Sequence, residues 1–414
     1  MSRSYDVVVV GGGSGGIGAA IGAARRGARV LLVERFPFLG GAATNSSVLG
    51  YCGFFDQRGE RVVAGAGEEV LKQLRDLGAY EEKTMSSSGN RVILLDAEAT
   101  KLACDAVTAA AGVDVLLHTT LIDVRREGDR VTEVELYHRG GRENVAASAF
   151  VDASGDGAVL AAAGAGVRVE PVERRQTSTL VCRFGGVTRD ADLAPDRLRA
   201  AVAAYRRDGG VQLARDSGLA ARLPLTGEVV ALLVDEQVDA LDVDALSRDE
   251  ASARRQAWHY LKALRTYLPG WSGAHLIETG PQMGIRESRH LIGRETLTAS
   301  DVLTTRKLPA TSIARCGWPI EDHAGPGVTR YTELAERGWY DVPYGAICAA
   351  DIDNVWGVGR LTSADAQAYA SVRVMGAAFA TGHAAGVAAA HYADGIPHDV
   401  AALRAELGRQ NAII

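Results

Sequence analysis

Three glycines and one acidic residue near the N-terminus have the types and spacing of a phosphate- and ribose-binding turn. Gly11, Gly13 and Gly16 form the pattern GxGxxG, and Glu34 follows about 20 residues on. In such a turn the first glycine permits the bend, the second lets the backbone approach a pyrophosphate, and the third allows close helix packing. A carboxylate at Glu34 would accept both ribose hydroxyls and repel a 2′-phosphate. The pattern therefore predicts a tightly held adenine dinucleotide other than NADP.

A strand–turn–helix–strand unit must position these residues, and the surrounding sequence predicts one. Residues 6–10 (DVVVV) form a β-branched run, which is typical of a parallel strand buried on both faces. A helix is expected over residues 14–26, with its first amide groups directed at the phosphates. A second strand is expected over residues 30–33, so Glu34 stands at its end.

Three later segments predict further parts of the same site. Residues 40–45 (GGAATN) form a second pliant loop with hydrogen-bonding side chains. Residues 149–157 (AFVDASGDG) predict a buried strand that runs into a glycine turn, after a β-meander with a hairpin turn at Gly128–Asp129. Residues 355–358 predict a short strand. The helix that follows is expected to start near Ser371–Val374, and its positive N-terminus would face the bound cofactor.

Together these segments resemble the FAD-dependent oxidoreductase family, within the glutathione-reductase-like flavoproteins. The resemblance extends along nearly the whole chain and includes VVVVGGGSGGIGAA, LGGAAT, VDASGDG, GIRESRHLIGRETLTASDV, GWPIEDH, VPYGAI and GVGRLTSADAQAYASVRVMGAAFATGHAAGVAAA. It implies an α/β fold in which a Rossmann-type, glutathione-reductase-like FAD-binding domain carries an inserted α+β substrate domain. His290, where relatives often repeat arginine, and Glu321–Asp322, where an aspartate usually precedes the histidine, depart from the family pattern.

The motif and the resemblance together predict the residues that bind FAD. These are Gly11, Gly13, Ser14, Gly15, Gly16, Glu34, Arg35, Gly40, Gly41, Ala42, Thr44, Leu121, Ser154, Gly155, Asp156, Gly359, Arg360, Ser371, Arg373 and Val374. For Arg360 two roles stay open, because its charge would either neutralise a reduced flavin or pair with Asp365.

Candidate catalytic residues lie in the substrate-side motifs of the resemblance. Arg286 is of the type that clamps a carboxylate, although it could equally pair with Glu287 or the FAD phosphates. His323 is the best candidate for a base, because its ordinary pKa lies near neutral pH. Tyr344 could donate a hydrogen bond to a substrate oxygen, and His290 is a weaker second base. For His323 and Tyr344 a structural role is the alternative.

The resemblance also implies a domain organisation. Residues 1–50, 95–168 and 340–395 would form the FAD-binding domain, residues 51–94 and 169–339 the substrate domain, and residues 396–414 a C-terminal surface helix. Within the substrate domain, residues 249–271 predict an amphipathic helix. Its buried face is expected to carry Trp258, Leu261 and Leu264.

Composition narrows the class of protein. The 414 residues are 47% hydrophobic and 23% charged, the balance of a globular protein, and the formal net charge of -6 disfavours a nucleic-acid binder. Five cysteines without a CxxC pair fit reduced thiols and a cytoplasmic location. We expect no metal site and no membrane span; an oligomer is possible.

The absence of a second GxGxxG unit and of a CxxC pair indicates that an organic substrate reduces the flavin. We therefore expect a dehydrogenase or oxidase that abstracts hydride from a small organic metabolite. One alternative is a flavin-dependent monooxygenase using NAD(P)H, a class that usually carries Gly-Asp where this chain has Gly359–Arg360. An alternative of another class is an FAD-binding module acting on RNA or a protein partner, which the acidic charge disfavours.

Overall fold

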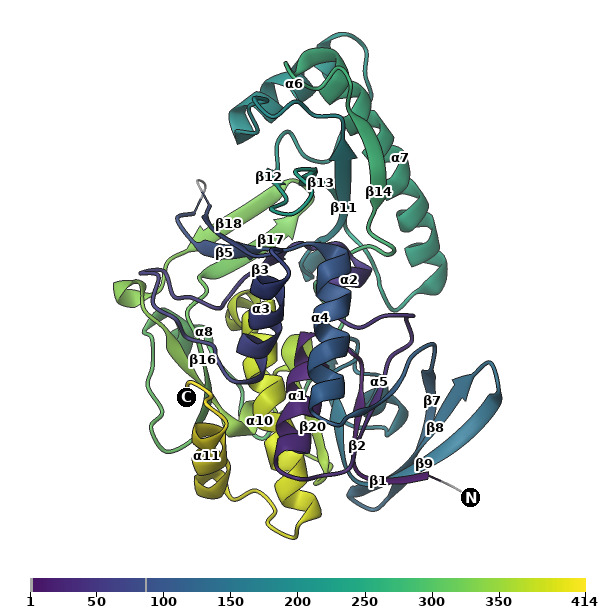
Figure 1. Ribbon diagram of the computed structural model, residues 1–414, viewed down its shortest axis with the longest axis vertical. Coiled ribbons are helices and arrows are strands. Elements are labelled where there is room, and N and C mark those ends of the chain that lie inside the picture. The colour runs from purple at the N-terminus through teal and green to yellow at the C-terminus, as the bar shows by residue number, and fades with distance from the viewer. Residues whose placement is uncertain (1–2, 86–87) are drawn as a thin grey trace.

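The computed structural model describes residues 3–85 and 88–414. The chain forms two lobes (Figure 1). The lower lobe contains both chain ends and a mostly parallel sheet, and the upper lobe is built around an antiparallel sheet between residues 178 and 279. Both sheets belong to one mixed α/β fold, which agrees with the α/β class expected from the sequence.

The sheet of the lower lobe is centred on the predicted N-terminal strand. In spatial order its strands are β6 (Asp114–Leu116), β2 (Val30–Val33), β1 (Arg3–Val10), β9 (Gly141–Asp152), β8 (Arg130–His138) and β7 (Thr120–Glu127), and β20 (Val355–Gly357) pairs with the end of β9. β1 runs parallel to β2 and β9, with Val8 opposite Leu31 and Phe150. β7, β8 and β9 form the expected antiparallel meander. Side chains on both faces of β1 are buried, as a β-branched parallel strand requires.

Two glycine-rich helices, α1 (Ser14–Arg25) and α10 (Met375–Ala393), lie side by side against one face of the sheet (Figure 1). A Cβ at Gly382 would overlap the carbonyl of Gly15, and one at Gly386 would overlap the carbonyl of Ala19. The small residues that were expected to bring α10 close to the sheet therefore bring it against α1. The predicted start of this helix near Ser371–Val374 agrees with its N-cap at Val374, while the short helix before it, α9 (Ala366–Val372), was not predicted.

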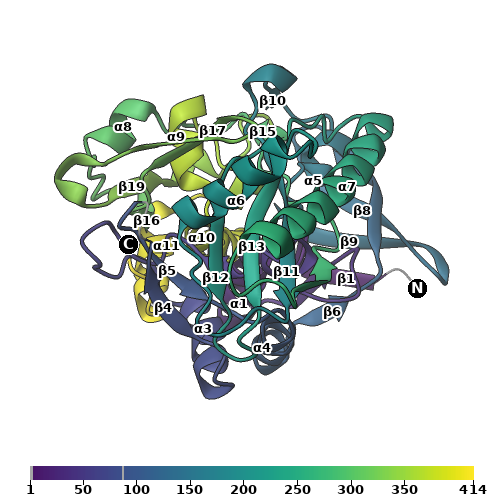
Figure 2. The same cartoon turned by 90° about the horizontal axis from the view of Figure 1, so that it is seen from above.

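The upper lobe is an antiparallel sheet covered on its outer face by two helices. Its strands lie in the order β12 (Leu219–Arg222), β13 (Val229–Glu236), β11 (Ser178–Gly185) and β14 (His275–Thr279). Figure 2 shows α6 (Pro195–Arg207) and α7 (Val243–Tyr267) lying over these strands. Alternation along β13 sends Ala231 and Leu233 into the core beneath the helices, while Val230 and Leu232 point to the opposite face.

The remaining elements lie within the lobes or between them. They are α2 (Ala42–Asn45), β3 (Gly50–Tyr51), α3 (Ala66–Asp76), β4 (Glu81–Thr84), β5 (Arg91–Leu94), α4 (Ala97–Ala110), α5 (Ala158–Ala162), β10 (Val167–Val169), β15 (Arg289–Leu291), α8 (Ala299–Leu303), β16 (Ser312–Cys316), β17 (Ile320–Gly325), β18 (Val328–Thr332), β19 (Tyr340–Pro343) and α11 (Val400–Arg409), with short 3-10 turns at Val172–Arg174, Ala335–Arg337, Tyr344–Ala346 and Gly359–Leu361. β17 and β18 form a hairpin, and β3, β5 and β4 form a small antiparallel sheet.

The prediction for the long helix of the upper lobe was wrong at one residue. Trp258 on α7 is 62% exposed, whereas Leu261 and Leu264 are buried as expected. The buried stripe of α7 runs through Ala253 and Ala257, and these small side chains let the helix lie close to the sheet. Trp258 stands one residue beyond that stripe and points away from the core.

Taken over residues 3–85 and 88–414, no helix combines the length and the apolar character needed to cross a membrane.

Candidate active site

A cavity of about 230 Å³, here called the glycine-turn cavity, lies where the carboxyl ends of β1, β2 and β9 meet. Three segments far apart in the sequence, near residues 11–46, 119–158 and 358–378, supply most of its lining. The predicted residues that line it are Gly11, Gly13, Ser14, Gly15, Glu34, Arg35, Gly41, Ala42, Leu121, Ser154, Gly155, Asp156, Gly359, Arg360 and Arg373.

The glycine turn leaves polar groups of α1 without partners at this cavity. A Cβ at Gly11, where φ is +105°, would overlap the carbonyl of Ala153, and a Cβ at Gly16 would overlap the carbonyl of Gly11. Gly13 caps the start of α1 with no side-chain hydrogen bond, and the buried Ser14 Oγ has no partner among the described residues. Free donors at an uncapped helix start suit a phosphate, so this lining fits the predicted dinucleotide.

Glu34 is held in place by backbone amides. Its Oε2 accepts a hydrogen bond from Gly12 N at 2.7 Å, and its Oε1 accepts one from Phe36 N at 3.0 Å. The side chain is buried at the edge of the cavity. Each carboxylate oxygen keeps capacity for a further donor, so Glu34 can still accept ribose hydroxyls.

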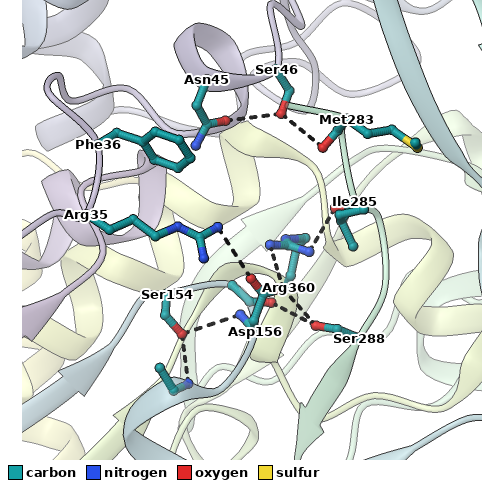
Figure 3. A network of polar contacts seen from close by, with 12 residues as sticks. Arg35, Phe36, Asn45, Ser46, Ser154, Asp156, Met283, Ile285, Ser288 and Arg360 are labelled. Atoms are coloured by element: carbon teal, nitrogen blue, oxygen red, sulfur yellow. Dashed lines mark hydrogen bonds and ion pairs between the residues drawn. The ribbon is translucent and has the colours of Figure 1, made fainter. Parts of the chain in front are cut away.

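Asp156 anchors a polar network on the floor of the glycine-turn cavity (Figure 3). Its Oδ1 accepts hydrogen bonds from Arg360 Nη2 at 3.2 Å and from Ser288 Oγ at 2.9 Å, and Arg35 lies 3.8 Å from its Oδ2. Arg360 therefore pairs with Asp156. Pairing with Asp365 does not occur, because that carboxylate caps α9 instead.

A second cavity of about 340 Å³, here called the apolar cavity, lies between the upper-lobe sheet and the lower lobe. It shares six lining residues with the glycine-turn cavity, namely Ala42, Gly284, Ile285, Arg360, Arg373 and Met375. Most of its remaining wall is apolar, from Val48, Leu49, Val92, Leu94, Leu219, Ala220, Ala221, Val230 and Leu232. The two cavities therefore adjoin each other.

One end of the apolar cavity is polar, and β17 builds part of it. Glu321 and His323 are two residues apart on this strand and so project to the same face. His323 Nε2 lies 3.4 Å from Glu321 Oε1. Glu321 also accepts hydrogen bonds from Trp318 Nε1 at 2.9 Å and Tyr331 Oη at 2.7 Å.

His323 is uncharged at neutral pH. Burial and the nearby charge of Arg286 lower the pKa of His323 to about 4, although Glu321 acts in the opposite direction. The hydrogen-bond network assigns the proton to Nε2, which faces Glu321, while Nδ1 lies 3.1 Å from Thr329 Oγ1. Both ring nitrogens are thus engaged, so His323 can accept a proton only after the Thr329 hydroxyl turns away.

Arg286 and Arg373 bring positive charge to the same end. The Arg286 guanidinium is enclosed and donates through Nη1 to the carbonyl of Thr177. Burial and the charge of Arg373 lower the pKa of Arg286 to about 10, so it remains charged at neutral pH. Arg373 Nη2 donates to the backbone carbonyl of Glu321 at 3.0 Å. This end of the cavity can therefore bind an anionic group.

A family model described as FAD dependent oxidoreductase matches residues 6–407. The chain belongs to the FAD-dependent oxidoreductase family. It is an enzyme and its cofactor is FAD, as the motifs predicted. The glutathione-reductase-like branch stays a prediction.

Curated relatives match shorter regions. A soluble pyridine nucleotide transhydrogenase from Sodalis glossinidius (strain morsitans) is 49% identical over 41 residues, which is 10% of this chain and 9% of that protein. A digeranylgeranylglycerophospholipid reductase from Thermoplasma volcanium is 27% identical over 158 residues, 37% of this chain and 40% of that protein. The matched regions thus span less than half of each relative.

A solved structure shares the fold. The geranylgeranyl bacteriochlorophyll reductase-like protein from Thermoplasma acidophilum has a TM-score of 0.51 at 15% identity, covering 100% of this chain and 85% of that chain. At this identity the likeness shows the fold alone. It supports the α/β architecture with a Rossmann-like parallel core.

Some predicted FAD-binding residues lie behind the cavity wall. Gly16, Gly40, Thr44 and Ser371 are not among the described residues that line the glycine-turn cavity, and Val374 lines the apolar cavity. Thr44 Oγ1 donates to the Leu39 carbonyl at 2.8 Å. Ser371 Oγ lies 2.8 Å from Tyr340 Oη. These hydrogen bonds hold the backbone segments whose neighbouring residues line the cavities.

Of the three catalytic candidates, the structure brings Arg286 and His323 to the apolar cavity. Tyr344 lines neither cavity within the described part of the chain. Its hydroxyl lies 3.0 Å from His398 Nδ1 and accepts a hydrogen bond from Trp356 Nε1 at 3.1 Å. Tyr344 therefore has partners inside the core and lies outside the site proposed below.

The remaining substrate-side candidate, His290, and its neighbour Arg289 also have internal partners. His290 Nε2 lies 2.8 Å from Glu287 Oε1, and its ring meets Tyr369 edge-on at 4.3 Å between centroids. Arg289 Nη1 donates to the carbonyl of Asp156 at 2.9 Å. These residues brace the segment that carries Arg286.

Sequence reasoning missed Glu321 as a site residue. The alternation of a strand could have found it, because Glu321 lies two residues before His323. It also missed the apolar wall from β12 and β13, whose residues have no chemical signature and meet the cavity only through folding.

Cys52 lines the apolar cavity, and burial raises the pKa of its thiol well above the usual range. All five cysteines are free. For metals, the residues 3–85 and 88–414 contain no group of three His, Cys, Asp or Glu side chains arranged to hold an ion.

Proposed function

We propose that the enzyme is a dehydrogenase or oxidase in which a small organic substrate in the apolar cavity gives a hydride to FAD held in the glycine-turn cavity. The observation that carries this proposal is that the two cavities adjoin each other and share six lining residues. A substrate in the apolar cavity would thus lie beside the cofactor. FAD supplies the two-electron acceptor for such a reaction.

The uncapped start of α10 supports this arrangement. Val374 caps the helix without a side-chain hydrogen bond, and the first helical residue, Met375, lines both cavities. The partial positive charge of a helix start favours negative charge beside it. Together with Arg360 and Arg373 it would stabilise the charge that builds up when the cofactor is reduced.

On the substrate side we assign roles to three residues. Arg286 binds and orients an anionic part of the substrate. Glu321 holds the proton of His323 on Nε2, which leaves Nδ1 as the acceptor for a substrate proton once the Thr329 hydroxyl has rotated. The apolar wall excludes water, which strengthens these polar interactions.

The predicted domain division forms part of this proposal. Residues 1–50, 95–168 and 340–395 supply most of the glycine-turn cavity, while Gln282, Gly284 and Ile285 come from the expected substrate domain. This assembly of one site from separated segments also supports the glutathione-reductase-like branch. Five free cysteines support a cytoplasmic location.

A second reaction direction is favoured by one comparison. The relative from Thermoplasma volcanium, matched over 37% of this chain, is named a reductase. In that direction another donor would reduce the flavin, and the compound in the apolar cavity would receive the hydride.

Anaerobic stopped-flow absorbance tests the proposal. The FAD-loaded enzyme is mixed with NADH, with NADPH, or with members of a panel of alcohols, hydroxy acids, amines and saturated acids. Loss of the flavin band with an organic compound in the absence of nicotinamide is the expected result. Rapid loss with NADH or NADPH alone, or only when an aromatic compound is also bound, would contradict it and favour the reductase or the monooxygenase.

A further inference from the structure

Two guanidinium groups at the polar end of the apolar cavity lack a carboxylate partner. Within the described part of the chain, Arg286 and Arg373 form no ion pair; each donates to a backbone carbonyl instead. The buried Arg373 Nε has no hydrogen-bond partner among the described residues. A buried cation without an anion is costly unless a ligand supplies the opposite charge.

The carboxylate on this end is already occupied. Glu321 accepts hydrogen bonds from Trp318 and Tyr331 and faces His323, and these contacts, with the charge of Arg373, outweigh burial and keep its pKa well below the ordinary value. Glu321 is therefore ionised and offsets one of the two guanidinium charges. His323 is neutral, and Glu321 is the one charged carboxylate among the described residues that line this end of the cavity.

The other carboxylates near these two arginines already have partners among the described residues. Glu287 Oε1 lies 2.8 Å from His290 Nε2, and its Oε2 accepts a hydrogen bond from Gln176 N at 2.8 Å. Asp235 is paired with Arg215 at 2.6 Å, and Asp156 is paired with Arg360. Lys83 lines the cavity from the exposed strand β4 and is in contact with solvent.

The rest of the wall calls for an apolar body. Val230 and Leu232 face the cavity from β13, and Leu49 packs with Val230 in the same small cluster. Leu94 on β5 adds to this wall. Such a surface gains free energy by burying hydrocarbon, roughly 25 cal/mol for each Å² removed from water.

We propose that the apolar cavity binds a monocarboxylate with an aliphatic or aromatic body, its carboxylate held between Arg286 and Arg373 and its body against β5, β12 and β13. This assignment rests on the proposed function for its catalytic meaning. Two guanidinium groups at one end of the cavity match the two oxygens of a carboxylate. Arg286 lines the apolar cavity and not the glycine-turn cavity, so its charge serves the substrate side.

Calorimetric titration of the oxidised, FAD-loaded enzyme tests this assignment without turnover. Decanoate, 1-decanol, decylammonium and acetate are the probes, since the first three share one tail and differ in head charge, and the fourth has the head without the tail. We expect decanoate to bind at least 10-fold more tightly than each of the others. Against 1-decanol and decylammonium the gain comes from charged hydrogen bonds to the guanidinium groups. Against acetate it comes from burial of the hydrocarbon tail.

Variants locate the head group. Arg286→Gln is expected to remove most of the preference for decanoate over 1-decanol, and Arg286→Lys to retain part of it. Arg183→Gln is the matched control for Arg286→Gln. Arg183 is a buried arginine on β11 of the upper lobe, but it is paired with Glu228 and Glu278 and is not among the described residues that line the cavity. It should keep the preference.

Each other outcome overturns the assignment. Equal binding of 1-decanol and decanoate to the wild-type enzyme would contradict recognition of an anionic head group. Equal binding of acetate and decanoate would contradict recognition of an apolar body. Tighter binding of decylammonium would make Glu321 the dominant charge. Failure of every probe to bind would overturn the substrate class, while flavin reduction by another organic compound would leave the proposed function standing. The comparison of the four probes on the wild-type enzyme tests the assignment even if Arg286→Gln does not fold.

Discussion

The glycine-turn cavity and the apolar cavity adjoin each other but are built in different ways. Backbone geometry makes the first: glycines packed against neighbouring carbonyls, the free amides at the start of α1, and strand ends brought together by parallel pairing. Side chains make most of the second, from the upper-lobe sheet, from β5 and β17, and from segments that are distant in sequence. Backbone sites tolerate few residue types, whereas a side-chain wall can change without disturbing the fold. Chemistry shared by a family is therefore expected in the first cavity, and substrate choice in the second.

The largest effect that would test this contrast is expected at the glycine turn. In Gly16→Ala the new methyl group would overlap the Gly11 carbonyl, which is backbone and cannot move aside. We expect the loss of bound FAD and a fall in unfolding free energy of roughly 3 kcal/mol or more, beyond ordinary overpacking. The FAD-to-protein ratio and thermal unfolding measure both. Gly408→Ala on α11, where a Cβ meets nothing within 4 Å, is the control and should retain FAD.

This contrast explains what the sequence could predict. The β1–α1–β2 unit and the meander lie in short local patterns, and both were predicted correctly. Glu34 and Asp156 also lie in such patterns, and the structure brings both to the glycine-turn cavity. The burial of Trp258 was predicted wrongly and Tyr344 lies away from both cavities, since the face of a helix and the partners of a hydroxyl depend on packing against distant segments. The role of Glu321 depends on its contacts with Trp318, Tyr331 and His323, and no local sequence pattern predicts those contacts.

A smaller but still large effect is expected in the core of the upper lobe. Trp271 is fully buried and meets Phe184 edge-on at 5.3 Å, whereas Trp258 is 62% exposed. Trp271→Ala should lower the unfolding free energy by about 3–5 kcal/mol, and Trp258→Ala by less than about 0.5 kcal/mol. Chemical denaturation of both variants measures this. Similar losses for the two would contradict the placement of α7.

Acid is expected to destabilise the lower lobe through a buried histidine on α10. Burial lowers the pKa of His383 to about 4, although its hydrogen bond with Gln410 acts in the opposite direction. The unfolded chain takes up a proton near pH 6.5 and the folded one does not, so stability is retained above pH 6.5 and falls as the pH drops toward 4. The loss for His383 is roughly 3 kcal/mol. Unfolding free energies of wild type and His383→Gln across this range test it; equal slopes would contradict it.

The smallest effect concerns the affinity for FAD. Glu34→Gln keeps the shape of the side chain but loses the charge that accepts a hydrogen bond from Gly12 N and that would accept others from the predicted ribose. We expect FAD binding to weaken by about 1–3 kcal/mol while the fold persists. Equilibrium titration of the apoprotein with FAD gives this value. Unchanged affinity would remove Glu34 from the cofactor site.

The most direct test of the central claim, that the two cavities form one reaction chamber, is a crystal structure of the FAD-bound enzyme. The account predicts that the isoalloxazine ring contacts the shared residues Arg373 and Met375, with one face open to the apolar cavity and with Arg286 and His323 beyond it. A ring that lies elsewhere, with other residues facing its reactive edge, would contradict the account.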